Sequence, residues 1–215
     1  MTTSGERRAQ GVRPSAARER LLETAAELFY REGITRVGLD RVLTEAGVPR
    51  ATMYRHFAGK EALVAACLEL EDTRIRLAVE SATGSATVPG PGSATAPAPA
   101  SGADPLDDLV VLIADDLATR HTRGCPFINA AVEYPDASSE VRQIVDRHRS
   151  WFRTVLQQAL LTRRPELTEE QAAEIAKGLY LLRDGALIGG YLDGPASVRD
   201  AFLRSARAIA DAPAS

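Results

Sequence analysis

Hydrophobic positions recur along most of the chain with the period of an α-helix. The first such segment covers about residues 15–32, with Ser15 suited to begin the helix and Gly33 suited to end it. Its apolar positions follow the i, i+3, i+4, i+7 spacing: Leu22, Ala25, Ala26 and Phe29. We therefore expect one amphipathic helix here, with this face packed against the rest of the chain.

Three more helices are predicted directly after the first. The second ends at Gly47, and its apolar face consists of Leu39, Val42, Leu43 and Ala46. The third is short: it begins near Pro49, a residue favoured in a first helical turn, and it ends around Gly59. The fourth opens at Lys60 and continues to about Glu80.

The second half of the chain predicts further helices of the same kind. Pro135 ends one of them, and Thr168 is a good N-cap for another because acidic residues follow it. Their expected ranges are 104–121, 125–134, 138–161, 168–193 and 197–212. Since no segment shows sustained alternation of apolar and polar residues, the sequence predicts an all-α fold of about nine helices.

Two segments lack this pattern. Residues 1–14 are polar and contain Arg7, Arg8 and Arg13, so we expect a flexible basic tail. Residues 81–103 contain no charged residue and four prolines among Ala, Gly, Ser and Thr. That composition is typical of a linker, so we expect a disordered loop that only connects its neighbours.

The charge is distributed unevenly along the chain. The net charge of the 215 residues is −3, yet residues 1–60 hold 11 Lys/Arg against 7 Asp/Glu, and residues 61–215 hold 15 against 22. A basic front on an acidic body suggests an N-terminal module that meets a polyanion. The excess is modest, and chance in a short segment is the alternative.

Several classes of protein find no support. No apolar run reaches the roughly 18 residues that cross a bilayer, and the N-terminus lacks an apolar signal core, so we expect a cytoplasmic protein without membrane contact. Two cysteines and three scattered histidines give no disulfide framework and no metal site: Cys67, Cys125, His56, His121 and His148. We expect no cofactor.

The helices before residue 60 follow the helix-turn-helix pattern, with the motif at about residues 38–57. Met53 and Phe57 lie on one arc of the third helix, where they can pack against the second helix. Four residues share a different arc of about 140°: Arg50, Ala51, Tyr54 and Arg55. This pattern predicts a helix that presents a polar, cationic face to another molecule.

The residue types on that face suit duplex DNA. Arg50 and Arg55 can make bidentate hydrogen bonds to guanine O6 and N7, and the small Ala51 leaves room for a thymine methyl. Donors to phosphate oxygens are Thr52, Tyr54, His56 and Lys60. The alternatives are a core tyrosine at Tyr54, a structural histidine at His56, and arginines that form only a solvated face.

The segments "LLETAAELFYREGITRVGLDRVLTEAG" and "AGVPRATMYRHFAGKEAL" resemble the DNA-binding helices of TetR-family transcriptional repressors over about residues 15–70. The resemblance implies a DNA-binding domain at 15–61 and a ligand-binding and dimerisation domain at 62–215. It gives DNA-contact roles to Arg50, Ala51, Thr52, Tyr54, Arg55, His56 and Lys60. Val37, Gly38 and Pro49 stand where many members carry Ser or Thr, so the usual hydroxyl contacts are missing there.

The resemblance also implies a homodimer on a palindromic operator, built by the last two helices of each chain. One short recognition helix reads few base pairs, and this independently favours two copies. The expected interface residues are mostly small and allow close approach: Gly185, Gly189, Gly190, Phe202, Ser205 and Ala206. Tight packing within one chain explains the glycines equally well.

A cavity for a small-molecule effector is implied between the two ends of the molecule. Its expected lining is Phe127, Asn129, Tyr134, Trp151, Tyr180 and Arg183, and any of these could instead be ordinary core. The segment "RGCPFINAAVEY" resembles a subgroup whose equivalent helix borders the pocket. Aromatic walls with few polar groups suit an apolar or aromatic effector.

The sequence thus favours a repressor that an effector releases from DNA. Cys125 offers an alternative, a sensor of oxidants or electrophiles, since Arg123 would lower the pKa of an exposed thiol. The apolar Pro126 and Phe127 favour a buried, inert thiol. More remote alternatives are a thiol hydrolase using Cys125 with His121 or His148, and a helical ligand-binding protein without DNA binding. No catalytic motif supports the hydrolase.

Overall fold

The computed structural model describes residues 16–84 and 104–213, and over these ranges it contains nine helices and no strand. The prediction of an all-α chain is confirmed. The helices are α1 Ala16–Glu32, α2 Leu39–Ala46, α3 Arg50–His56, α4 Lys60–Thr83, α5 Pro105–Thr119, α6 Pro126–Glu133, α7 Glu140–Arg163, α8 Glu169–Asp193 and α9 Pro195–Ala210.

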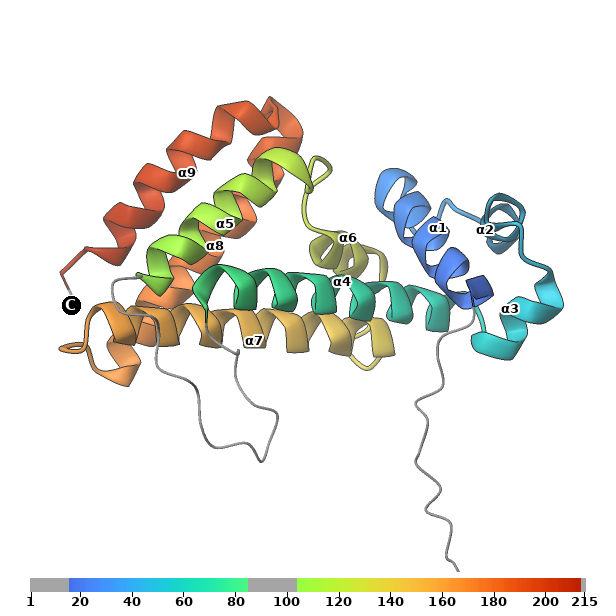
Figure 1. Cartoon of the computed structure of the whole chain (residues 1–215), viewed down its shortest axis with the longest axis horizontal. Helices are drawn as coiled ribbons and strands as arrows, with labels where there is room; N and C mark the ends of the chain where they lie inside the picture. The colour runs from blue at the N-terminus through green and yellow to red at the C-terminus, as the bar shows by residue number, and fades with distance from the viewer. Residues whose placement is uncertain (1–15, 85–103, 214–215) are drawn as a thin grey trace, which may run out of the picture.

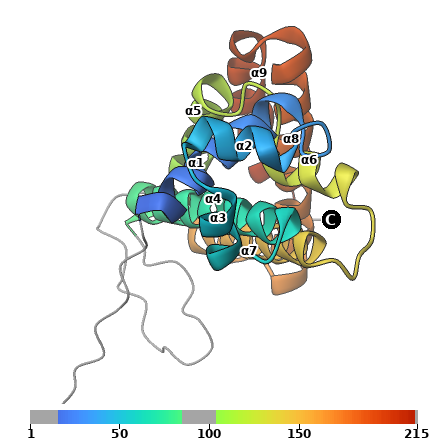
Figure 2. The ribbon, with the colours of Figure 1, turned by 90° about the vertical axis from the view of Figure 1, so that its right-hand side faces the viewer.

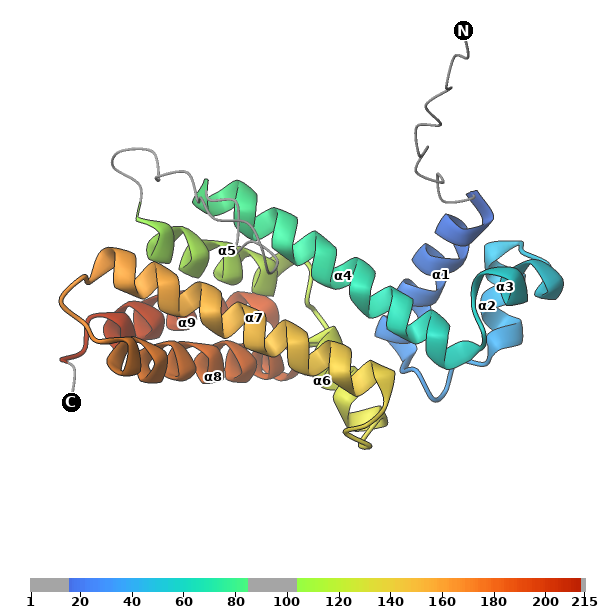
Figure 3. The ribbon, with the colours of Figure 1, turned by 90° about the horizontal axis from the view of Figure 1, so that it is seen from below.

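The molecule has a small head and a larger body, joined by one long helix (Figure 1). The head consists of α1–α3 and the body of α5–α9, while α4 runs from the head along the body. Seen from below, α7 lies beside α4, and α8 lies beyond it (Figure 3). Seen from the head end, α2 and α3 lie in front of the body (Figure 2).

The predicted loop at 81–103 begins too early. Residues 81–83 belong to α4, and the chain leaves the helix at Gly84, whose φ of 61° is left-handed. The helix continues because Val79 and Thr83 are buried, and the Thr83 hydroxyl donates to the Val79 carbonyl at 2.9 Å. Residues 85–103, the predicted tail at 1–14 and the predicted cap Ser15 lie outside the described residues.

Three body helices begin with a side-chain cap, and the sequence predicts one of these caps, at Thr168. Thr168 accepts from the backbone of Gln171, whose side chain accepts from the backbone of Thr168, and this completes a capping box. Asp104 and Ser139 cap α5 and α7 through their side-chain oxygens. These caps fix where α5, α7 and α8 begin, whereas α6 and α9 begin at a proline without a side-chain cap.

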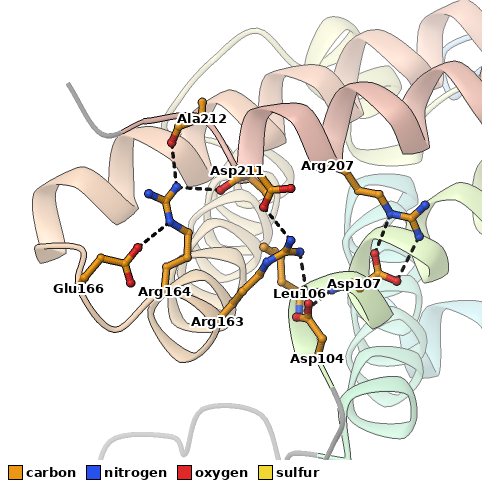
Figure 4. Close-up of polar contacts among 10 residues, drawn as sticks. Asp104, Leu106, Asp107, Arg163, Arg164, Glu166, Arg207, Asp211 and Ala212 are labelled. Carbon is orange, nitrogen blue, oxygen red and sulfur yellow. Dashed lines mark hydrogen bonds and ion pairs between the residues drawn. The ribbon is translucent and has the colours of Figure 1, made fainter.

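Ionic contacts join the ends of α5, α7 and α9 far from the head (Figure 4). Arg163 lies 3.2 Å from the N-cap Asp104 and 2.7 Å from Asp211 at the end of α9. Arg207 of α9 contacts both carboxylate oxygens of Asp107 on α5. Because these pairs are partly solvated, they orient the helix ends more than they stabilise the fold.

The head is attached to the body by α6 and the loop before it. Glu133, at the end of α6, accepts hydrogen bonds from the backbone N–H groups of Ile34 and Thr35 in the α1–α2 turn. The Tyr30 hydroxyl accepts from the Arg123 backbone at 2.8 Å and donates to the Gly124 carbonyl at 3.0 Å. The orientation of the head therefore depends on α6 as well as on α4.

Candidate nucleic-acid interface

The turn between α2 and α3 has the tight geometry that the motif requires. Gly47 ends α2 with a left-handed φ of 62° and donates to Thr44, and Val48 donates to the Leu43 carbonyl at 3.1 Å. A side chain at position 47 would be strained by this φ. Gly38 begins α2 without any side-chain cap bond, as we expected from the missing hydroxyl.

Helix α3 divides into a buried and an exposed face. Met53 is fully buried and Phe57 is 5% exposed, within the core that includes α1 and α2. Tyr54 is 50% exposed, so it is not a core tyrosine. The other residues of the predicted DNA face are also exposed: Arg50, Ala51 and Arg55. The division matches the arcs that the sequence predicts.

Arg50 has a partner that sequence reasoning missed. Its guanidinium donates to Asp40 in the first turn of α2, and this hydrogen bond raises the pKa of Arg50. The only signal in the sequence was an acidic residue ten positions earlier, on the helix that precedes the turn. Arg55, in contrast, has no ion pair among the described residues, so its guanidinium is the one more readily offered to a ligand.

The remaining predicted DNA contacts lie at the margins of the exposed face. Thr52 and His56 are half-buried, and the His56 ring meets the Phe57 ring edge-on. The Lys60 ammonium lies 5.8 Å from the centre of the Phe29 ring, and burial lowers its pKa. Arg18 of α1, which sequence reasoning also missed, lies over Phe57 at 5.4 Å and adds a cation beside α3.

Two cavities border α4. The larger, of about 300 Å³, lies where α1, α4 and α6 meet, and Asn129 is among its lining residues. The smaller, of about 170 Å³, lies among α4, α5, α7 and α8, and Arg183 is among its lining residues. The other predicted ligand contacts line neither cavity: Phe127, Tyr134, Trp151 and Tyr180.

Aromatic packing explains why three of them, Phe127, Trp151 and Tyr180, do not line a cavity. Phe127 stacks on His148 with ring centres 3.7 Å apart, and Trp151 and Phe152 meet edge-on. Tyr180 is 2% exposed, and burial raises the pKa of its hydroxyl to about 12. Side chains in such close contact fill the space that a ligand would need.

The buried histidines carry opposite shifts. His148 bonds to Asp72 at 2.7 Å, yet burial lowers the pKa of its imidazole. Burial also disfavours the charged form of His121, but hydrogen bonds to Asp116 and Glu71 outweigh it and raise the pKa. In the described part of the chain, no three His, Cys, Asp or Glu side chains are grouped so as to hold a metal ion.

Both cysteines are free and buried. Cys125 is 1% exposed at the start of α6, which favours the inert thiol over the reactive one. Burial raises the pKa of the Cys67 thiol to about 12. Within the described residues, no helix is both long and apolar enough to cross a bilayer.

The structure separates the predicted interface residues into two groups. Phe202, Ala206 and Gly190 are buried within the chain, and Val198 lies only 3.3 Å from where a Cβ on Gly190 would be. These three contribute to the packing of α9 on α8 and are not contact surface. Gly189 packs on Val198 in the same way. Gly185 and Ser205 are exposed.

An exposed apolar stripe on α8, which sequence reasoning missed, surrounds Gly185. Leu181, Ile188 and Leu192 are 60%, 40% and 71% exposed and follow one face of the helix. A Cβ on Gly185 would meet nothing within 4 Å. The period of α8 alone could not reveal this stripe, because apolar residues occur on both of its faces.

Known proteins resemble the head and the whole chain to different extents. The profile of the family described as "Bacterial regulatory proteins, tetR family" matches residues 21–67. An uncharacterised HTH-type transcriptional regulator from Mycobacterium tuberculosis is 35% identical over 63 residues, a match that spans only 31% of that protein's length.

Two relatives extend over most of the chain. TtgR, an HTH-type transcriptional regulator from Pseudomonas putida, is 29% identical over 193 residues, which cover 84% of this chain and 82% of TtgR. The crystal structure of a TetR-family transcriptional regulator from Streptomyces coelicolor is 36% identical, with a TM-score of 0.77. That match covers 90% of this chain and 94% of the other.

Proposed function

The chain belongs to the TetR family of transcriptional regulators, and we propose that it is a repressor that a small, largely apolar or aromatic effector releases from its operator. It is a helix-turn-helix DNA-binding protein and not an enzyme. The observation that carries the proposal is the division of α3 and its C-cap, with Met53 and the C-cap Phe57 buried and Arg50, Tyr54 and Arg55 exposed.

The exposed face of α3 enters the major groove in this proposal. Arg55 reads a guanine, and Arg50 does so after it exchanges Asp40 for the base edge. Ala51 packs on a thymine methyl. The contacts to phosphate oxygens come from Thr52, Tyr54, His56 and Lys60. These contacts do not depend on base identity, so they position the helix without selecting the sequence.

Two copies of the chain pair with each other through the α8 stripe, with Gly185 and Ser205 at the contact. The pair then binds one palindrome through its two α3 helices. Exposed large apolar residues in a row mark an interaction surface, and Leu181, Ile188 and Leu192 form such a row. An isologous contact between two such rows generates two-fold symmetry, which is the symmetry of a palindromic operator. Residues 15–61 then act as the reading domain, and residues 62–215 as the sensing and pairing domain.

Effector binding is coupled to the head through α4 and α6. Both cavities border α4, which follows α3 after three residues, and the larger cavity also borders α1 and Asn129 of α6. An effector that fits only one orientation of these helices lowers DNA affinity by its differential affinity for the two states. Glu133 transmits the change because it holds the α1–α2 turn.

A DNA-binding assay tests the proposal. The purified protein should retard the DNA upstream of its own gene. Arg55→Ala should cost about 1–3 kcal/mol and relax specificity at one base pair, because it removes a base contact. Lys60→Ala should weaken binding on all sequences and reduce its salt dependence.

Arg153→Ala is the matched control, because Arg153 is an exposed arginine on α7 in the body, away from the head. It makes the same change of charge and should leave affinity and specificity unchanged. Equal losses on all sequences from Arg55→Ala would remove the base-reading role, and equal losses from Arg153→Ala would refute the placement of DNA on α3.

A further inference from the structure

Arg183 is a charged side chain buried without an adequate partner. It is only 4% exposed, and it is among the residues that line the smaller cavity. Its one side-chain hydrogen bond among the described residues goes to the neighbouring Asp184, at 3.5 Å, the outer limit for such a bond. A guanidinium carries five N–H donors, so most of its donor capacity is unused.

The carboxylates near Arg183 are engaged elsewhere. Asp184 lies 2.9 Å from Arg149, a stronger contact than the one to Arg183. Asp116, which also lines the cavity, bonds to His121 and lies 3.8 Å from Arg120. Asp115, at the cavity rim, accepts two hydrogen bonds from Arg199. No acidic group of the cavity is therefore dedicated to the Arg183 charge.

Aromatic rings hold the guanidinium without using its donors. The central carbon of Arg183 lies 4.9 Å from the Phe152 ring centre and 5.5 Å from that of Tyr180. Such contacts orient a cation but accept no in-plane hydrogen bond. A carboxylate that accepts these unused hydrogen bonds would also pair with a mostly buried charge, so it would be bound strongly.

We propose that the smaller cavity binds the effector as a carboxylate, with Arg183 donating in bidentate fashion to the acid group. The inference rests on the proposed function and names the chemical class of its effector. The rest of the ligand is compact and apolar, because Ile75, Val79 and Ile113 line the same cavity and its volume is about 170 Å³. A planar carboxylate matches the guanidinium fork.

Thermal shift and calorimetric titration with one-ring and short-chain acids test the inference. The probes are benzoate, phenylacetate and octanoate at millimolar concentration, each paired with its neutral primary amide. The acids should raise the Tm of the wild-type protein, and the amides should not. Arg183→Met should weaken acid binding roughly tenfold to hundredfold, as expected for a hydrogen bond to a charged group.

The stability of the free protein provides a second measurement. Arg183→Met removes a buried charge whose ion pair with Asp184 is long, at 3.5 Å, so the Tm without ligand should stay the same or rise. Arg76→Met is the matched control, since Arg76 also lies over an aromatic ring, that of Trp151, but has a proper partner in Asp72 at 2.6 Å. Arg76→Met should lower the Tm and leave acid binding intact.

Three results would overturn the inference: no acid shifts the wild-type Tm, acids and amides shift it equally, or Arg183→Met binds the acids as well as wild type does. If Arg183→Met does not fold, the guanidinium is needed for the fold, and acid binding is then measured on Arg183→Lys. It keeps the charge but loses the fork, so undiminished acid binding by Arg183→Lys would also contradict the inference. Because these assays contain no DNA, their failure leaves the DNA-binding proposal standing.

Discussion

The head and the body place their candidate functional residues in opposite environments. In the head, buried residues such as Met53 form a small scaffold, and the cations that are proposed to touch DNA lie on its outside. In the body, Arg183 is 4% exposed and lines a cavity among the helices. A surface site tolerates substitution of its contact residues without loss of fold, whereas an internal site shares its residues with the core.

This difference explains why functional residues are easier to predict from the sequence in the head than in the body. On a short amphipathic helix, a polar residue type predicts an exposed position, and α3 follows that rule. In the body, an aromatic residue is predicted to be buried. Its residue type does not show whether it lines a cavity or packs in a filled core. Phe127 and Tyr180 belong to filled core, while Arg183 lines a cavity. Four substitutions outside α3 would sharpen or break the contrast, from the largest expected effect to the smallest.

The largest effect is expected from Gly185→Trp on the proposed dimer stripe. A Cβ there meets nothing within 4 Å, so the single chain accommodates the substitution, whereas a closely packed partner helix does not. Loss of the second reading head should lower operator affinity by about a hundredfold or more, since linked binding sites gain that much. Sedimentation should show a monomer with an unchanged circular dichroism spectrum.

Ala173→Trp is the control for this variant. Ala173 is exposed on α8, and it lies near the start of the helix, outside the stripe. It should sediment as wild type and bind DNA as wild type. A Gly185→Trp protein that remains dimeric would place the interface elsewhere and would leave the apolar stripe without a role.

A smaller effect is expected from Glu133→Gln at the junction of head and body. Burial disfavours the carboxylate, but the backbone N–H groups of Thr35 and Ile34 outweigh it and lower the pKa of Glu133. The stabilisation that this contact provides is therefore present above the ordinary carboxyl pKa. It is lost as the pH falls through the pKa of Glu133 in the folded chain. Its removal should cost about 1 kcal/mol of stability, because the site is partly solvated.

Hydrogen exchange separates this local effect from a general one. Exchange at Ile34 and Thr35 should accelerate in Glu133→Gln while the core of the body keeps its protection. Glu174→Gln, at an exposed pair with Lys177, should change neither. If Glu133→Gln responds to effector as wild type does, coupling passes through α4 alone.

The smallest effect concerns the pH dependence set by His121. Because its folded pKa is raised, its contribution to stability is fully present below the ordinary histidine pKa and is lost as the pH rises through the folded value. The difference in unfolding free energy between wild type and His121→Gln should therefore be largest at pH 6 and shrink towards pH 8, by about 1 kcal/mol at most.

His148 provides the opposite slope within the same body. Its folded pKa is lowered, so the unfolded chain takes up the proton first and stability falls as the pH drops below the ordinary value. Replacing His148 with Gln should remove that loss on the acid side. Denaturant titrations of both variants across this pH range measure the two slopes. Parallel profiles would contradict the opposite pKa shifts of His121 and His148.

Local signals in the sequence determined the helices, most of their ends and the two faces of α3. The hydrophobic period, Gly47 and the cap at Thr168 each act over a few neighbouring residues, so they can be recognised from the sequence alone. The same holds for the resemblance of the head to a known family, which depends on closely spaced residues. The predicted loop failed at residues 81–83 because burial against distant helices prolongs α4.

Only the tertiary structure decided which residues share an environment. Asp40 meets Arg50 across a turn, Val198 fills the space beside Gly190, and Leu181, Ile188 and Leu192 are left exposed when α9 covers the other side of α8. The sequence already predicts Arg183 as a ligand contact, but only the packing of the helices pairs the neighbouring carboxylates with other cations. Such facts depend on contacts between residues far apart in the chain, and these are fixed by how the helices pack, not by the pattern within any one of them.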